Sequence, residues 1–181
     1  MTSRNRKICV VTGSRADYGL LTPLLRKLAS TNEISLLLMV TGMHLSERFG
    51  ATWRAIETDG FRIDRKVDML ECNDDPVAIA KSIGTAVAGF AEAFRQFQPA
   101  LLVLLGDRFE ILAAAIAALP AAIPIAHIHG GELTEGGFDD SIRHALTKMA
   151  HLHFTAAREY TRRVTQMGEQ PTRVFTVGAL G

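Results

Sequence analysis

Short apolar runs alternate along the whole chain with longer segments in which apolar residues recur at helical spacing. The strand-like runs are 7–13, 34–42, 61–70, 100–107, 123–131, 151–156 and 173–178. Most are apolar almost throughout, which is typical of strands buried on both faces, whereas 61–70 alternates like a more exposed strand. This rhythm predicts an α/β fold, with a mostly parallel sheet covered by helices on both faces.

The helical segments between these runs carry start and stop signals. They are 18–30, 51–60, 74–99, 109–120, 139–149 and 158–168. Asp17 or Thr22 is expected to cap the first helix, and Thr22 would place Pro23 at the favoured first helical position. Asp75 and Pro76 are expected to open the long helix 74–99.

The bulk composition describes one ordinary folded domain. The chain has 181 residues, 48% of them hydrophobic, and a net charge of +1. A charge this small gives no field that would recruit nucleic acid or an anionic membrane, so neither is an expected partner. The sequence ends in the strand-like run VFTVGALG, from which we expect one half of a longer protein.

Cysteine usage and apolar segments bear on where the protein works. The chain has two cysteines, Cys9 in an apolar run and Cys72 in a polar stretch, which favours reduced thiols in the cytoplasm. The apolar run at the N-terminus is too short for a signal peptide. Pro120 and Pro124 interrupt the longest apolar stretch, so we interpret it as core and not as a membrane span.

Glycine next to a polar or charged side chain recurs where the expected strands end. The four tripeptides are Gly13-Ser14-Arg15, Gly42-Met43-His44, Gly106-Asp107-Arg108 and His129-Gly130-Gly131. In open parallel sheets, ligands bind beyond the carboxyl ends of the strands. The sequence therefore predicts a binding site at this edge, to which glycine allows close backbone approach.

Two of these turns suggest specific chemistry. GSRADYG has neither a dinucleotide fingerprint nor a P-loop lysine, yet its glycine and the following helix could hold a phosphate with Arg15 as donor. The alternative is a plain strand-to-helix turn with a solvated arginine. Asp107 follows the most apolar strand, where burying a carboxylate is costly unless it has a functional role or a partner. Pairing with Arg108, or capping of the next helix, is the structural alternative.

The histidines raise the question of a metal. His-x-His occurs twice, but neither Cys-x-x-Cys nor His-Glu-x-x-His is present, and no metal site is expected. His151 and His153 are interpreted as structural residues that share one face of a strand. His127 and His129 end a strand at the expected ligand edge, which favours a functional role for them over one for His151 and His153.

Asp139 and Asp140 precede the helix 139–149, and either carboxylate could cap it while the other faces the site. The glycine-rich loop GGELTEGG before them is longer than a minimal connection needs, which favours a binding loop.

Five motifs, in order along the chain, resemble the hydrolysing UDP-N-acetylglucosamine 2-epimerases of bacterial sialic-acid and legionaminic-acid pathways. They are GSRADYG, GMHLSERFG with WRAIETDGF, LLGDRFEILAAA, HIHGGELTEG and DDSIRHALTKMAHLHF, and the resemblance extends from Lys7 to Gly181. It implies that residues 1–181 form the Rossmann-like N-terminal domain of a two-domain GT-B-type fold. The family's second domain, which holds much of the uridine diphosphate site, is absent from this chain.

The resemblance also implies a reaction that needs no cofactor. A base removes the proton from C2 of the UDP-sugar while UDP leaves C1, and water then adds to the 2-acetamidoglycal. The products are UDP and the free 2-epimeric sugar, N-acetylmannosamine or a diacetamido analogue. By motif match, Asp107 and Asp139 correspond to catalytic carboxylates, and Arg15 and Arg108 to phosphate-contacting arginines. His44 lies in another of the matching motifs and is grouped with the substrate-binding residues.

The chain departs from its relatives at three points. Gly19 stands where some relatives have a serine that touches the nucleotide, so that contact would be through backbone or absent. His129 stands where several relatives have a catalytic glutamate, so either His129 takes the acid–base role or Glu132 does. The loop before the aspartate pair is longer by one residue, which leaves Asp139 and Asp140 as alternatives.

Two other functions remain open. A glycosyltransferase-like GT-B domain would bind a UDP-sugar without eliminating UDP. Asp107 and Asp139 both pointing at the sugar would favour the epimerase, and one of them buried in a structural pair would favour the rival. An isolated domain without its nucleotide-holding partner would be non-catalytic, and we expect the 181-residue chain alone to be inactive. The resemblance suggests a homodimer or homotetramer for the full-length protein.

Overall fold

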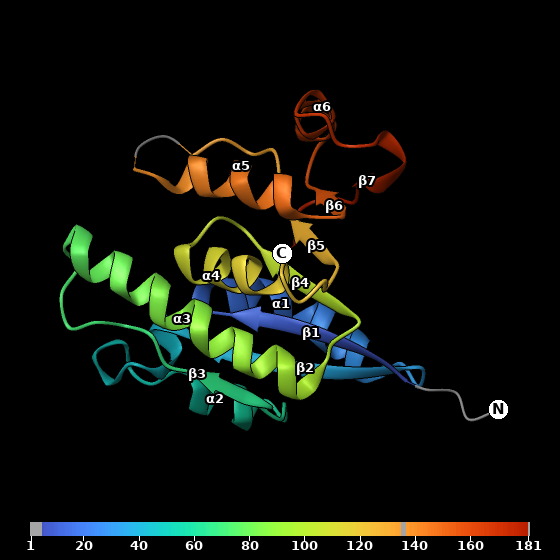
Figure 1. The fold of residues 1–181 in the computed structure, drawn as a ribbon. Helices are drawn as coiled ribbons and strands as arrows, with labels where there is room; N and C mark the ends of the chain where they lie inside the picture. Colours follow the sequence, from blue (N-terminus) through green and yellow to red (C-terminus); the bar gives the residue numbers. More distant parts are fainter. Residues whose placement is uncertain (1–4, 135–136, 181) are drawn as a thin grey trace.

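The computed structural model describes residues 5–134 and 137–180, which form one α/β domain (Figure 1). The strands are β1 (Arg6–Thr12), β2 (Ile34–Thr41), β3 (Arg65–Val67), β4 (Leu101–Leu105), β5 (Ile125–Ile128), β6 (Leu152–Thr155) and β7 (Val174–Thr176). The helices are α1 (Arg15–Ala29), α2 (Trp53–Thr58), α3 (Pro76–Phe97), α4 (Phe109–Ala118), α5 (Asp139–Met149) and α6 (Arg158–Gln166). Three short 3-10 turns are η1 (Gly42–Leu45), η2 (Glu47–Phe49) and η3 (Pro171–Arg173).

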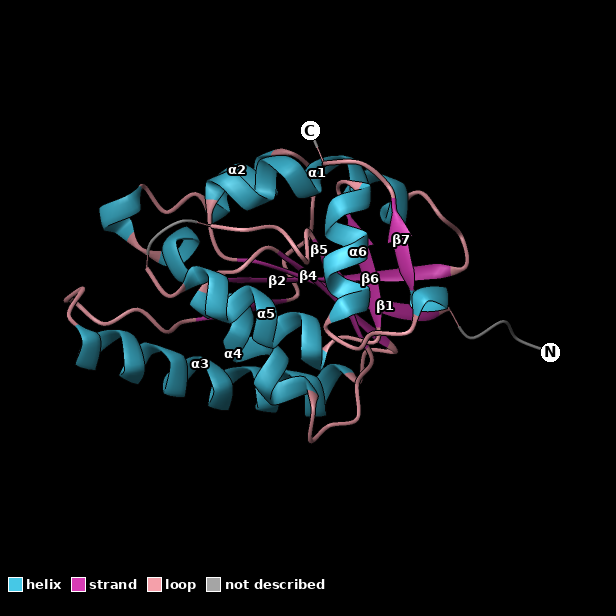
Figure 2. Ribbon diagram, turned by 90° about the horizontal axis from the view of Figure 1, so that it is seen from above, coloured by secondary structure: helices cyan, strands magenta, loops and turns pink. Residues whose placement is uncertain are grey.

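The strands form a single sheet in the order β3-β2-β1-β4-β5-β6-β7, and every pairing in it is parallel. Figure 2 shows α1 and α2 on one side of this sheet and α3, α4 and α5 on the other. The predicted Rossmann-like fold class is therefore confirmed. A parallel sheet brings the carboxyl ends of all strands to one edge, so the loops that follow the strands are neighbours in space.

Alternate strand residues supply two separate cores, one on each face of the sheet. Cys9 and Val11 pack with α3, α4 and α5, in a core that includes Phe90 and Ile111. Val10 points the other way and belongs to the core beneath α1 and α2. Both faces are apolar because both are covered, which explains the near-continuous apolar runs of the sequence.

Two local predictions differ from the structure. The cap of α1 is Ser14, whose hydroxyl accepts from the Asp17 amide at 3.4 Å, so neither Asp17 nor Thr22 is the N-cap. Asp17 completes a capping box by accepting the Ser14 amide at 2.9 Å. As a result Pro23 lies inside α1, and Thr22 donates to the Tyr18 carbonyl at 2.8 Å.

The expected exposed strand 61–70 is regular only over Arg65–Val67. The predicted start of α3 is confirmed, since Asp75 accepts from the amides of Val77 and Ala78 and Pro76 is the first helical residue.

Among the described residues, α3 alone is long and apolar enough to cross a membrane by length and composition. Its side chains Phe90 and Phe94 are almost completely buried in the core shared with α4. A core helix passes the same test, so α3 provides no argument for a membrane span.

Candidate active site

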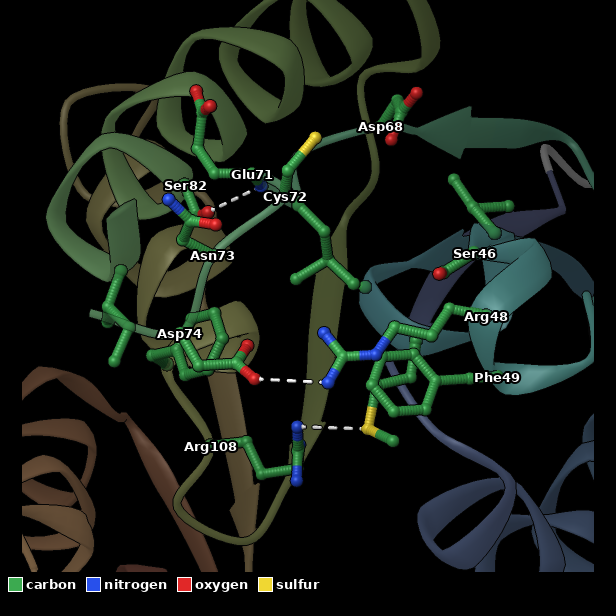
Figure 3. A pocket seen from close by; sticks show the side chains of 16 residues that line it. Ser46, Arg48, Phe49, Asp68, Glu71, Cys72, Asn73, Asp74, Ser82 and Arg108 are labelled. Carbon is green, nitrogen blue, oxygen red and sulfur yellow. Dashed lines mark hydrogen bonds and ion pairs between the residues drawn. The ribbon is translucent and has the colours of Figure 1, made fainter. Parts of the chain in front are cut away.

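Three hollows lie along the carboxyl edge of the sheet. The central pocket, of about 250 Å³, is lined by the loops that follow β1, β4 and β5 and by α5. An outer pocket of about 510 Å³ lies between α1 and α2, and a side pocket of about 460 Å³ lies between the ends of β2 and β3 (Figure 3). Arg108 lines both the central pocket and the side pocket, so these two hollows adjoin.

The central pocket brings together four of the predicted site residues. They are Asp107, Arg108, His129 and Glu132, and they come from two loops about twenty residues apart in the chain. Arg143 of α5 completes this group, although it was not among the predicted residues. Its only sequence signal was its place in the motif DDSIRH.

Arg143 contacts several of the residues around the central pocket. Its side chain is 8% exposed, and it forms an ion pair with Asp107. The guanidinium also donates to the His129 carbonyl at 2.8 Å and to the Thr134 hydroxyl at 2.9 Å, and lies 3.6 Å from Glu132. Because two carboxylates converge on one buried cation, the charge of each is partly balanced within the pocket.

Asp107 is paired with Arg143, and not with Arg108 as the structural alternative proposed. Its second partner is Thr134, which donates to the carboxylate at 3.1 Å. The Asp107 side chain remains 18% exposed and lines the central pocket. It is therefore both a member of an ion pair and accessible from the central pocket.

His129 and Glu132, the two alternatives for the acid–base role, form a pair. His129 Nδ1 lies 3.2 Å from a Glu132 carboxylate oxygen. The Leu180 amide donates to His129 Nε2 at 3.2 Å, so this nitrogen accepts a hydrogen bond while Nδ1 faces Glu132. His129 itself has a left-handed backbone, with φ of 65°. An unusual backbone at this position turns the side chain into the pocket beside Glu132.

Asp139 and Asp140 occupy the first turn of α5 but neither caps it, because the N-cap is Phe138 and it makes no side-chain cap. Asp140 lies 3.7 Å from His144 and accepts from the Thr134 amide at 3.4 Å. Neither aspartate is among the described residues that line the central pocket. The loop before them includes 135–136, outside the described residues, so their catalytic role stays a prediction.

Arg108 forms its ion pair with Glu110, which sequence reasoning missed. The guanidinium donates to the Glu110 carboxylate at 2.8 Å and 3.2 Å. Burial lowers the pKa of Arg108, but the contacts with Glu110 outweigh this, so the pKa is raised and the cation is retained.

The outer pocket is lined by three of the predicted substrate- or UDP-binding residues, Arg15, Gly19 and His44. Arg15 is exposed and its side chain is available to an anion. His44 is completely buried between Thr12 and Thr52, at 3.0 Å and 2.6 Å from its two ring nitrogens. Burial also lowers the pKa of His44. In this arrangement His44 supports the strand ends, and its predicted substrate contact stays a prediction.

The other histidines next to these strands serve the fold. His127 is completely buried, with Nε2 2.7 Å from the Gly106 carbonyl, and burial lowers its pKa to about 4. His153 is buried 3.1 Å from Glu169. His151 precedes β6, is exposed, and accepts from the Ile125 amide at 3.3 Å, so it does not share the environment of His153. No cluster of three metal-ligating side chains occurs within the described ranges.

The parallel sheet with helices on both faces and a charged pocket at its carboxyl edge defines a Rossmann-like α/β domain. The UDP-N-acetylglucosamine 2-epimerase family model matches residues 26–181, and the chain belongs to this family. It is 43% identical over 175 residues to a GDP/UDP-N,N'-diacetylbacillosamine 2-epimerase (hydrolyzing) of Campylobacter jejuni, covering 97% of this chain and 45% of that protein. It is 44% identical over 176 residues to a UDP-N,N'-diacetylbacillosamine 2-epimerase (hydrolyzing) of Legionella pneumophila, covering 97% and 46%. The chain thus spans about half the length of these relatives.

Solved structures agree on the fold. The Neisseria meningitidis UDP-GlcNAc 2-epimerase bound to UDP-GlcNAc superposes with a TM-score of 0.84 at 18% identity, over 96% of this chain and 46% of that one. A lipopolysaccharide outer core galactosyltransferase superposes with a TM-score of 0.64 at 9% identity, over 95% of this chain and 45% of that one. The fold is therefore shared with a glycosyltransferase, whereas the family match is to the UDP-N-acetylglucosamine 2-epimerases.

Proposed function

We propose that the protein to which this chain belongs is a hydrolysing UDP-sugar 2-epimerase. The observation that carries the proposal is the central pocket, where Asp107 and the His129–Glu132 pair lie around one buried arginine. Removal of a proton from C2 and its return to the other face require two acid–base groups at one sugar carbon. Departure of UDP requires cations, which Arg15 and Arg108 supply.

The reaction has two steps in this proposal. Asp107 takes the proton from C2 while the C1–O bond breaks, the electron pair forms the C1=C2 bond, and UDP leaves with the bonding electrons of C1–O. The His129–Glu132 pair then gives a proton to C2 from the opposite face, and water adds to C1 of the glycal. The proton that the water loses goes to the pair and restores it, and Asp107 releases its proton to solvent. The products are UDP and the free 2-epimeric sugar. In this proposal Asp139 or Asp140, in the first turn of α5, is a further catalytic carboxylate.

The sugar is UDP-N-acetylglucosamine or a UDP-diacetamido sugar, with N-acetylmannosamine or its diacetamido analogue as product. The names of the two relatives at 43% and 44% identity favour the diacetamido sugar. The test incubates the full-length protein with each UDP-sugar in D₂O and follows the products by NMR. A 2-epimeric free sugar with one deuterium at C2 is expected. A released or transferred sugar that keeps its C2 hydrogen and configuration would support the glycosyltransferase alternative.

We further propose that a second domain supplies the other wall of the site and most of the uridine contacts. The 181-residue chain should then fold but turn over no UDP-sugar, because positioning contributes up to about 7–11 kcal/mol to such a reaction. Exposed Phe175 and Val177 should also promote its self-association. An assay of residues 1–181 beside the full-length protein tests this, and turnover within about tenfold of the full-length rate would contradict it. A cytoplasmic location and a homodimer or homotetramer stay predictions.

A further inference from the structure

Glu110 is a carboxylate completely removed from solvent, in the first turn of α4. Burial of a carboxylate is costly unless it is paired and hydrogen-bonded. Both of its oxygens accept from Arg108: Nε donates at 3.2 Å to each oxygen, and Nη2 donates at 2.8 Å to one of them. The pair holds the guanidinium by two of its three nitrogens, so the plane of the group is fixed.

The ends of two strands make room for this carboxylate. A Cβ atom added to Gly42 would lie 2.8 Å from a Glu110 oxygen and 2.9 Å from its Cγ. A Cβ atom added to Gly13 would lie 3.4 Å from the Glu110 Cβ. Gly13 and Gly42, which follow β1 and β2, therefore leave room for the Glu110 side chain as well as for a ligand. Three loops converge on one side chain that lies behind the pocket.

Arg108 presents its remaining edge to the pockets. It lines both the central and the side pocket, and its side chain is 39% exposed (Figure 3). Within residues 5–134 and 137–180 its hydrogen bonds use Nε and Nη2, with Met43 sulfur as a weak second acceptor at 3.5 Å. Nη1 is the nitrogen that these bonds leave for an anion.

We propose that Glu110 is a positioning residue, which holds the Arg108 guanidinium in the orientation that binds the departing diphosphate. This inference rests on the proposed function. A fixed guanidinium loses less conformational entropy when it binds a phosphate, and a donor that is already oriented stabilises the developing charge of the leaving group. Glu110 itself touches neither the sugar nor the phosphate.

The proposal opposes a simple electrostatic expectation. Glu110 carries a negative charge near the anion site, so its removal by Glu110→Gln makes the site more positive. If charge alone mattered, UDP would bind more tightly to the variant. If orientation matters, the variant loses kcat/KM and gains no affinity for UDP, because Arg108 is released from its fixed plane.

The experiment is a double-mutant cycle in the full-length protein, with Glu110→Gln, Arg108→Ala and the double variant. We measure kcat and KM with the active UDP-sugar, and UDP affinity by calorimetry. Glu110→Gln is expected to lower kcat/KM at least about tenfold, a scale at which one oriented donor matters. In the Arg108→Ala background the same change is expected to have an effect of less than about twofold, since Arg108 is then gone.

Two further variants separate positioning from folding. Glu110→Asp keeps the charge but shortens the side chain, and should restore part of the activity that Glu110→Gln loses. Asp64→Asn is the matched control, because Asp64 is a buried carboxylate paired with an arginine two residues away and lies at the amino end of β3. It should leave kcat/KM unchanged. Thermal melts of all variants identify any that fail to fold, and Glu110→Asp then takes the place of Glu110→Gln in the cycle.

The outcomes are distinct. Additive effects in the cycle, or tighter UDP binding with unchanged kcat/KM, would overturn the positioning role and leave the epimerase proposal intact. A wild-type protein that binds UDP without epimerising a UDP-sugar would overturn the proposed function, and the same cycle read in UDP affinity would still decide the role of Glu110. A wild-type protein that neither binds UDP nor turns over would overturn both.

Discussion

Two arginine–carboxylate pairs with the same spacing lie at opposite ends of the strands. Arg62 and Asp64 precede β3, whereas Arg108 and Glu110 follow β4. Both carboxylates are buried, with side chains 2% and 0% exposed. The arginines differ, because Arg62 is 84% exposed and Arg108 is 39% exposed. Asp64 accepts a hydrogen bond from the Leu38 amide of β2 at 2.9 Å, and its partner Arg62 is solvated.

The same contrast extends to the whole carboxyl edge. Buried polar side chains gather where the strands end or just beyond, as at Thr12, Thr41, His127 and Thr155. Buried polar groups need partners, and His127, whose Nε2 lies 2.7 Å from the Gly106 carbonyl, holds the loop that carries Asp107 and Arg108. Buried charge at the amino end therefore supports the fold, whereas buried charge at the carboxyl edge also lines the candidate site.

Asp107→Asn should have the largest effect. In the full-length protein the amide preserves size but removes the proposed base, and loss of a general base typically lowers kcat by about 10²–10⁴-fold. Asp64→Asn, the matched change at the amino end of β3, should leave kcat unaltered. A steady-state assay measures both. An Asp107→Asn variant that keeps more than about a tenth of the wild-type rate would remove Asp107 from the mechanism.

Arg143→Met should produce the largest loss of stability. The change leaves Asp107 and Glu132 in the pocket without their cation, and breaking a buried ion pair costs about 3–5 kcal/mol. Urea unfolding of the 181-residue chain measures it. Arg62→Met is the comparison at the amino end of β3. Since that arginine is mostly in solvent and Asp64 keeps the Leu38 amide as a partner, its midpoint should move less. Equal shifts for the two variants would erase the distinction between the two ends of the sheet.

His127 should make the stability depend on pH. Its folded pKa of about 4 lies below the ordinary 6.5, so the unfolded chain takes up the proton first as the pH falls. Stability from the neutral ring is therefore complete above about pH 6.5 and decreases by up to about 3 kcal/mol toward pH 4. His127→Gln should show a smaller decrease between pH 7.5 and pH 4.5.

Urea unfolding at the higher and the lower pH measures how much stability wild type and the His127→Gln variant each lose. His44 and His153 also have lowered pKa values because of burial, and they contribute to the same window in both proteins. The comparison with wild type cancels their contributions. Identical losses in the two proteins would mean that His127 is protonated without cost.

The fold could be predicted from the sequence because apolar periodicity is local. The cap of α1 could not, since the sequence suggests Asp17 or Thr22, whereas the cap is Ser14 and Asp17 is its N3 partner in a capping box. The strand 61–70 was predicted too long, because alternation continues where pairing with β2 does not. Local patterns find elements, and their ends depend on tertiary contacts.

The sequence predicts where the candidate side chains lie better than it predicts their partners. Asp107 and His129 are placed at the carboxyl edge because each follows a buried strand, and Glu132 enters through the family resemblance. The partner of Asp107 could not be predicted, because Arg143 lies 36 residues further along and only the packing of α5 brings it close. Adjacency suggested Asp107 with Arg108, yet successive side chains in extended backbone point apart, and Arg108 turns to Glu110 instead.

Arg15→Ala should have the smallest effect of the four. Arg15 is exposed at the start of α1 and lines the outer pocket. Within the part of the chain that the structure describes, no acceptor holds its guanidinium in place. Loss of a charge-assisted contact to phosphate costs about 1.5–3 kcal/mol, and solvent exposure places the effect at the low end, near tenfold in UDP affinity. Calorimetry of the full-length protein with UDP at low and high salt measures it, and the difference between wild type and variant should shrink as salt rises.

Arg158→Ala, an exposed arginine of α6 outside the three pockets, is the control. If Arg15→Ala binds UDP as tightly as wild type at low salt, Arg15 is a solvated residue of an ordinary strand-to-helix turn, and the cation for the leaving group is Arg108 alone.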